Sequence, residues 1–321
     1  MPTPPARRSA CLAVLATAAG LFAFSLPAAA EETDAAAVDS AAPFQLPEIE
    51  IDSELGIPDP ESERLRRIIV GTLREVGRFP LPIADPSGEK ARVIIRASRE
   101  SYIEAGGIEG SAGRYLGRSR TVVIDASFLL DDRTTADPAA RQALLVHEAA
   151  HLAMHTRQRH MPQWLVEGLC EWFAAAHTGG GDFQEDAPHN AIRRHLLRRY
   201  QLRPPATIDL LPIADITKLS PEEWDSLVDR LPVERKHHAY TTALLLTHYL
   251  VFGGAERREW VRELVEDAAT PRPRGRRSAR VEIPSDLADA LEESAAIEDA
   301  LTRFWRQQAL TLRFTPAGAG D

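Results

Sequence analysis

The chain has 321 residues, of which 44% are hydrophobic and 26% are charged, and its formal net charge is −9. This length is enough to bury the core of one large domain or two smaller ones, and the composition argues against wholesale disorder. The acidic balance argues against a general nucleic-acid binder, because such proteins need a positive surface. The sequence has two cysteines, Cys11 and Cys170, which excludes a disulfide scaffold.

Residues 1–30 have the composition of an export signal. Arg7 and Arg8 precede an apolar stretch, which ends in three alanines before Glu31 and Glu32. An uncleaved membrane anchor is the alternative, but the small residues and the abrupt acidic switch favour cleavage. Cleavage removes two positive charges and takes the net charge from −9 to −11. We therefore expect an exported protein, periplasmic or extracellular, with no membrane span after removal of the signal.

The rest of the chain divides by composition. Residues 31–61 are rich in Ala, Glu, Asp and Pro and lack periodicity, which predicts a flexible acidic arm. Residues 62–312 are expected to form a single domain, and residues 313–321 a loose tail. Five arginines between 272 and 280 predict a solvated loop, with the recruitment of an acidic partner as the alternative.

Hydrophobic periodicity predicts an α+β fold. Apolar residues between 65 and 79 recur at helical spacing. Residues 92–97 and 121–126 are predicted strands, with a glycine-rich loop or hairpin between them at 106–117. From Asp137 onward the pattern is mostly helical. We therefore expect a small antiparallel or mixed sheet followed by a mostly α-helical lobe.

The chemical signal begins at residues 147–151, which read His-Glu-Ala-Ala-His on the predicted helix that starts at Asp137. Histidines at i and i+4 lie on one helix face, so both imidazoles can reach one zinc ion. Glu148 then lies where it can take a proton from a bound water. The alternative is a solvent-facing helix with i,i+4 pairs. The apolar residues before the motif argue against it, because unpaired polar groups on a buried helix are costly.

A catalytic zinc site also needs a third protein ligand and one open position. Residues 162–173 form an apolar helical pattern that is interrupted by Glu167 and Glu171. Glu167 is the candidate third ligand and Glu171 the candidate partner of a ligating histidine. Ion pairs of these glutamates with arginines such as Arg193 or Arg194 are the alternative.

Residues near the motif limit the class of metallopeptidase and the possible ligands. Met154 and Arg157 stand where the metzincin extension requires glycine and histidine, which excludes that class. His155 and His160 are close to the motif but are expected to be solvated. Because the signal would carry Cys11 away, the scarcity of cysteine argues against a cysteine-ligated zinc.

The combined pattern resembles the gluzincins, the metallopeptidase group that includes thermolysin and the zinc aminopeptidases. Residues 164–171 are similar to the W-L-x-E-G-x-A-E form of peptidase-like gluzincin domains, with Cys170 where alanine is common. The motif itself covers residues 147–173. A G-x-M-E-N exopeptidase motif is absent from the sequence, so the aminopeptidase subclass is not supported. The resemblance matches the zinc ligands to His147, His151 and Glu167, the catalytic base to Glu148, and the carboxylate that orients a zinc-bound histidine to Glu171.

The resemblance implies a zinc-dependent metallopeptidase with one zinc ion per chain, a peptide or protein substrate, and an active site between sheet and helical lobe. It also implies a tyrosine or histidine that stabilises the oxyanion. Tyr240 is the best match and His238 the second, with an ordinary packing role for Tyr240 as the alternative. By the same analogy, residues 121–126 are expected to form the sheet edge that pairs with substrate.

A rival hypothesis from a different class is a zinc-stabilised binding domain at the cell envelope that cuts no peptide. Glu148 favours the enzyme, because a purely structural site does not need it. The sequence leaves open the substrate, endopeptidase against exopeptidase activity, and the oligomeric state.

Overall fold

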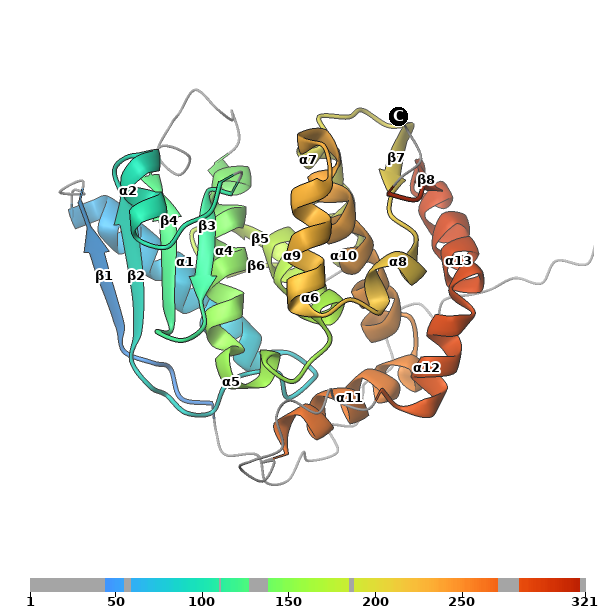
Figure 1. Cartoon of the computed structure of the whole chain (residues 1–321), viewed down its shortest axis with the longest axis horizontal. Coiled ribbons are helices and arrows are strands. Elements are labelled where there is room, and N and C mark those ends of the chain that lie inside the picture. The colour runs from blue at the N-terminus through green and yellow to red at the C-terminus, as the bar shows by residue number, and fades with distance from the viewer. Residues whose placement is uncertain are drawn as a thin grey trace, which may run out of the picture. The chain divides into compact units, whose positions relative to one another are not determined.

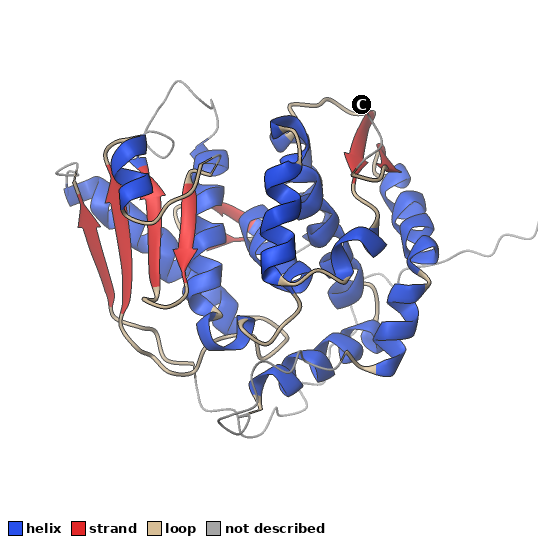
Figure 2. Ribbon diagram, in the orientation of Figure 1, coloured by secondary structure: helices blue, strands red, loops and turns tan. Residues whose placement is uncertain are grey.

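The N-terminal part of the described chain contains a four-stranded sheet (Figures 1 and 2). Its strands lie in the order β1 (Ile49–Ser53), β2 (Ala91–Arg96), β4 (Thr121–Asp125) and β3 (Gly113–Leu116). The β1–β2 and β2–β4 pairs are parallel, whereas β3 runs antiparallel to β4. The sheet is therefore mixed, and the predicted α+β class is confirmed.

The computed structural model describes most of the chain beyond the N-terminal region. The described residues are 44–54, 59–109, 111–126, 138–184, 188–270 and 283–317. All of them belong to one unit, Asp39–Asp321. The expected signal at 1–30 and the arginine-rich loop at 272–280 lie outside them. Among the helices described, none combines the length and apolar character that crossing a membrane requires.

Helices cover both faces of the sheet. On one face, α1 (Asp59–Arg78) and α4 (Pro138–Ala153) pack into the main core. On the other face, α2 (Arg99–Glu104) places Tyr102 against the central strands. All five residues of β4 are buried, as expected for a β-branched strand covered on both sides.

Three features of the strands differ from the sequence-based expectation. β1 lies within the segment predicted to be a flexible arm, because it pairs with β2 along its whole length and buries Ile49. β8 (Leu310–Phe314) extends past the predicted start of the tail and pairs in parallel with β7 (Ala206–Leu210). The prediction that residues 121–126 form a sheet edge is wrong, because β4 lies between β2 and β3; the edge beside α4 is β3.

The helical part is built around α6 (Gln163–Ala176), which packs against both α4 and α10 (Lys236–Phe252). Every residue of α6 from Trp164 to Ala176 is buried. The remaining elements are α5 (His155–Gln158), β5 (His177–Gly179), β6 (Asp182–Phe183), α7 (Pro188–Arg199), α8 (Ile213–Thr217), α9 (Pro221–Arg230), the 3-10 turn η1 (Val233–Arg235), α11 (Ala255–Ala269), α12 (Ser285–Glu292) and α13 (Ser294–Gln307).

Candidate metal centre

Polar side chains gather where α4 and α6 cross, inside an otherwise apolar core. His147, Glu148 and His151 lie in the second half of α4 and are 9%, 6% and 8% exposed. Glu167 and Glu171 come from α6 and are 6% and 4% exposed. Burying five ionisable groups together is costly unless each has a partner or they share a metal ion.

Three of these side chains converge on one point. The Nε2 atoms of His147 and His151 lie 3.2 Å apart, and Oε2 of Glu167 lies 3.3 Å from the first and 3.7 Å from the second. A triangle with these sides has a circumscribed radius of about 2.0 Å, close to the ~2.0–2.2 Å bonds that zinc makes to nitrogen and oxygen. The donor set and its spacing therefore fit a zinc ion.

The outer nitrogens of the two imidazoles have partners of their own. Nδ1 of His147 lies 3.3 Å from Oε1 of Glu171. Nδ1 of His151 donates to Oε1 of Gln158 at 2.9 Å, while Nε2 of Gln158 donates to the His151 carbonyl oxygen at 2.9 Å. That second bond fixes the orientation of the Gln158 amide, because a carbonyl oxygen can only accept.

These partners determine where the imidazole protons lie. With both Nδ1 atoms donating, the two Nε2 atoms carry lone pairs that face each other and Oε2 of Glu167. Three acceptors at this spacing repel unless a cation lies between them. In the metal-free protein a proton can take that role. Burial lowers the pKa of His147, but its hydrogen bonds to Glu167 and Glu171 outweigh burial and raise the pKa to about 10.

Glu167 is held ionised and aimed at the histidines. Burial alone raises its pKa, but the nearby His151 and His147 outweigh burial and lower the pKa to about 2. Nε2 of Gln163 donates to Oε1 at 2.7 Å, which leaves Oε2 for the two imidazoles. An ionised carboxylate in this position is the form that binds a metal.

Glu171 connects His147 to an arginine. Its Oε2 lies 2.7 Å from NH2 of Arg199 and 3.4 Å from Nε2 of His195. Burial raises the pKa of Glu171, but Arg199 and the two histidines lower it well below its usual range. The expected carboxylate–histidine contact is thus present in the geometry, together with an ion pair on the far side.

The arginines named as alternative partners bind elsewhere. Nε of Arg193 donates to the carbonyl oxygen of Gln308 at 2.7 Å, and Arg194 donates to the side chain of Gln184. Arg199, five residues after Arg194 on α7, provides the ion pair instead.

Glu148 lies on the β3 side of the cluster. A Cβ atom at Gly113 would lie 3.1 Å from Cγ and 3.2 Å from Oε1 of Glu148, so the carboxyl group packs directly against the edge strand. Burial raises the pKa of Glu148, although His147 and His151 oppose the shift. A carboxyl group with a raised pKa beside a metal site can take part in proton transfer.

Cys170 also belongs to the cluster. His147, His151 and Cys170 form a buried group that could hold a metal ion, with their ligand atoms within 4.8 Å of one another. This corrects the inference from cysteine scarcity, because Cys170, the one cysteine among the described residues, lies at the site. Burial and the nearby carboxylates raise the pKa of its thiol well above the usual range. The ionised Glu167 is therefore the better third ligand.

Of the two oxyanion candidates, Tyr240 lies beside the cluster. Its ring centroid is 6.1 Å from that of His147, and Trp224 of α9 lies 5.6 Å away. His238 instead lies beside Tyr200, with ring centroids 6.1 Å apart. The structure thus brings Tyr240, and not His238, next to the candidate metal ligand His147.

The two histidines after the motif behave differently. His155 is only 6% exposed, so its predicted solvation is wrong. Its Nδ1 bonds the hydroxyl of Tyr115, and NH2 of Arg159 lies 3.1 Å from its Nε2. His160 is exposed, as expected.

Sequence reasoning missed five side chains that hold the cluster: Tyr115, Gln158, Gln163, His195 and Arg199. Helical spacing could have found Gln163, at i−4 from Glu167, and the i,i+4 pair on α7. It could not have found Tyr115, whose ring stacks on that of His151 with centroids 5.9 Å apart, because that contact joins a strand to a helix.

Comparison of the sequence with protein-family models and with curated proteins gives no match in either case.

Proposed function

We propose that this chain is an exported zinc-dependent metallopeptidase, with His147, His151 and Glu167 holding one zinc ion. The observation that carries the proposal is the convergence of three acceptor atoms within 3.7 Å of one another, beside the buried carboxyl group of Glu148. A bound zinc ion would supply Lewis acidity, polarising the scissile carbonyl and lowering the pKa of water. Export rests on the composition of residues 1–30.

Glu148 is the general base and acid of this proposal. It takes a proton from the attacking water and delivers that proton to the leaving amine. Its raised pKa suits the second step, because a carboxyl group with a raised pKa holds the proton until the amine accepts it. The packing against Gly113 keeps the carboxyl group at the edge-strand side of the ligands.

Tyr240 is the proposed donor to the oxyanion that forms on the carbonyl oxygen. Burial raises the pKa of its hydroxyl well above the usual range, so the group stays protonated and can donate. Its edge-on contacts with His147 and Trp224 hold the ring at the site.

Strand β3 is the proposed binding edge for an extended peptide. It pairs with β4 on one side and with no other strand among the described residues. Gly113 and Tyr115 are two residues apart and lie on the face of β3 that packs against α4. There Gly113 contacts Glu148, and the ring of Tyr115 stacks on that of His151. A peptide added to this edge would present its backbone to the reacting groups.

The test is metal analysis together with a peptide-library cleavage screen on the wild type and on Glu148→Gln. We expect one zinc per chain in both proteins, and a loss of turnover of at least ~100-fold in the variant. Glu259→Gln, which alters an exposed glutamate on α11, is the matched control and should keep full activity. Turnover retained in Glu148→Gln would refute the assignment of Glu148 as the general base.

Cys170 favours one second candidate, a zinc-stabilised binding domain without activity. A thiolate added to the two histidines and Glu167 would give four protein ligands, the closed set typical of structural zinc. A folded wild type that holds one zinc, loses it in Cys170→Ala and cuts no peptide would establish this candidate instead.

A further inference from the structure

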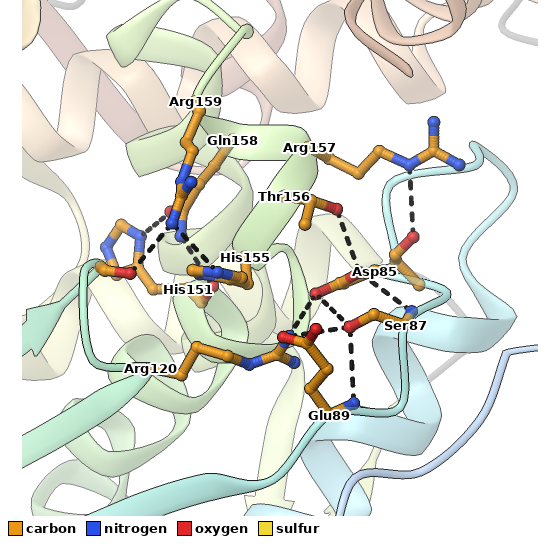
Figure 3. Close-up of polar contacts among 12 residues, drawn as sticks. Asp85, Ser87, Glu89, Arg120, His151, His155, Thr156, Arg157, Gln158 and Arg159 are labelled. Atoms are coloured by element: carbon orange, nitrogen blue, oxygen red, sulfur yellow. Dashed lines mark hydrogen bonds and ion pairs between the residues drawn. The ribbon is translucent and has the colours of Figure 1, made fainter. Parts of the chain in front are cut away.

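The short helix α5 joins the candidate metal ligand His151 to a buried ion pair outside the site. It begins at His155, two residues after the end of α4 at Ala153, and Met154 is the single residue between them. Figure 3 shows its side chains pointing in two directions, toward His151 on one side and toward Asp85 and Arg120 on the other. A helix of four residues has no stability of its own, so these contacts determine its orientation.

The first set of contacts holds His151 from two directions. Gln158 makes two hydrogen bonds to this residue, one to Nδ1 and one to the carbonyl oxygen, both 2.9 Å. His155 bonds the hydroxyl of Tyr115, whose ring lies nearly parallel to that of His151, at 4°. The orientation of the His151 ring therefore depends on where α5 places these two side chains.

The second set of contacts holds α5 itself. The hydroxyl of Thr156 donates to Oδ1 of Asp85 at 3.0 Å, and Oδ2 of Asp85 lies 3.1 Å from NH1 of Arg120. The backbone N–H of Asp85 donates to the carbonyl oxygen of Ala153 at 2.7 Å, at the end of α4. Asp85 thus contacts both α4 and α5 at the junction between these two helices.

The ion pair is built into the fold. Asp85 is 3% exposed and Arg120 is 7% exposed. Arg120 also reaches Ser87 at 2.8 Å and Glu89 at 3.0 Å, and it adopts a left-handed backbone with φ 49°. A non-glycine residue in that region is held there by its surroundings. Removing one partner of such a pair would leave an uncompensated buried charge, so the two side chains hold each other in place.

We propose that Asp85 and Arg120 are positioning residues for the metal centre, acting on His151 through Thr156 and Gln158. The inference rests on the metal centre of the proposed function but not on its peptidase chemistry. The four residues, Asp85, Arg120, Thr156 and Gln158, are called the α5 clamp below. Partners behind a metal-binding histidine fix its ring and its tautomer, and their loss costs ~10–100-fold in metal affinity.

The experiment measures zinc dissociation constants by competition with a chelating indicator. Gln158→Met removes both hydrogen bonds at similar volume, and we expect zinc to bind ~10–100-fold more weakly. Thr156→Val removes the link to Asp85 from an exposed position and should weaken zinc binding in the same direction, whereas Thr156→Ser should restore it. Thr311→Val, an exposed threonine on β8, is the matched control and should leave the constant unchanged.

A double variant tests the route. If Thr156 acts through Gln158, Thr156→Val combined with Gln158→Met binds zinc no more weakly than Gln158→Met alone. Asp85→Asn should behave like Thr156→Val, and Thr156→Val carries the test if Asp85→Asn fails to fold. The visible spectrum of the cobalt-substituted protein should change in Gln158→Met and Thr156→Val and stay the same in Thr156→Ser and Thr311→Val.

The outcomes separate this inference from the proposed function. Zinc constants unchanged in Thr156→Val and Gln158→Met, or losses that add in the double variant, overturn the α5 clamp while the metal centre stands. A wild type that binds no zinc at all overturns both.

Discussion

Gly168 of α6 lies directly against Thr247 of α10, since a Cβ atom at position 168 would lie 2.1 Å from Oγ1 of Thr247. The same atom would lie 2.4 Å from the carbonyl oxygen of Ala243. The helices can approach this closely because glycine has no side chain at the crossing point. Glu167 is the preceding residue, so the crossing also sets how far the candidate ligand extends toward α4.

We therefore expect Gly168→Ala to destabilise the fold. Alanine improves helix propensity by ~1 kcal/mol, which by itself would stabilise α6. The clash opposes this gain, and because one of the atoms involved belongs to the backbone, a rotamer change cannot relieve it. Overpacking of this kind costs ~1–3 kcal/mol. Urea unfolding of the metal-free protein checks the sign, and a variant more stable than the wild type would contradict the close crossing.

The contact between Gly113 and Glu148 predicts a variant that separates metal binding from turnover. In Gly113→Ala the new Cβ would press on Cγ and Oε1 of Glu148 from 3.1 and 3.2 Å. We expect zinc to remain bound, and turnover to fall by less than ~100-fold, because ~100-fold is the effect of a 1 Å misplacement of a reacting group and the carboxyl group has to move by less than that.

Gly117→Ala, in the hairpin that joins β3 to β4, is the control for this prediction. There the nearest atom, in the Tyr115 ring, would lie 3.6 Å away, which is ordinary contact. Activity should be kept in the control. Equal activity of the two variants would show that the packing of Glu148 against β3 does not matter for the reaction.

The link from His147 through Glu171 to Arg199 predicts two losses in Glu171→Gln. Arg199, whose side chain is 17% exposed, would lose its carboxylate partner. A fully buried charge without its partner destabilises a fold by ~3–5 kcal/mol, so we expect a smaller loss here. His147 would lose the ionised acceptor at Nδ1, so zinc affinity should fall ~10–100-fold. Thermal unfolding without zinc measures the loss of stability, and the shift of the midpoint on adding zinc measures the loss of zinc affinity. A zinc affinity that does not change would show that Glu171 serves the fold and not the metal.

The sequence predicts the histidines and the glutamates of the candidate site because their spacing follows helical geometry. His147 and His151 are one turn apart on α4, and Glu167 and Glu171 are one turn apart on α6, so each pair shares a face whatever the tertiary structure. The sheet class was predictable for a similar reason, because β-branched runs mark β2 and β4.

What the sequence did not predict depends on contacts between elements. β1 has only a short period-2 pattern, in which Glu50 and Asp52 alternate with isoleucines, and the acidic, proline-containing composition around it favours an arm. The pairing with β2 makes it a strand, and the two acidic side chains form ion pairs beside that strand. β3 is a four-residue strand containing glycine, too short for periodicity to separate it from a loop. His155 is buried because α5 packs against Tyr115, a contact between two elements that the sequence pattern does not indicate.

A last prediction concerns pH and lies away from the site. His248 on α10 is 8% exposed and stacks on Phe252 with ring centroids 5.4 Å apart. Burial, with a smaller contribution from His189, lowers its pKa to about 3. In the unfolded chain the pKa of histidine is ~6.5, so between these two values the unfolded state binds one more proton at this position. The contribution of His248 to the free energy of unfolding is therefore fully present above pH ~6.5. It falls as the pH is lowered toward 3, by up to ~1.4 kcal/mol per pH unit.

Replacing His248 by phenylalanine should remove this part of the dependence and keep the aromatic stacking. We expect the free energy of unfolding of His248→Phe, measured in urea with a chelator present, to fall less steeply than that of the wild type between pH 6 and pH 4. The variant should keep some slope, because burial also lowers the pKa of His177 and of His195 to about 4. Parallel curves for the two proteins would show that His248 is protonated in the folded state, and would refute its assignment as a buried neutral residue.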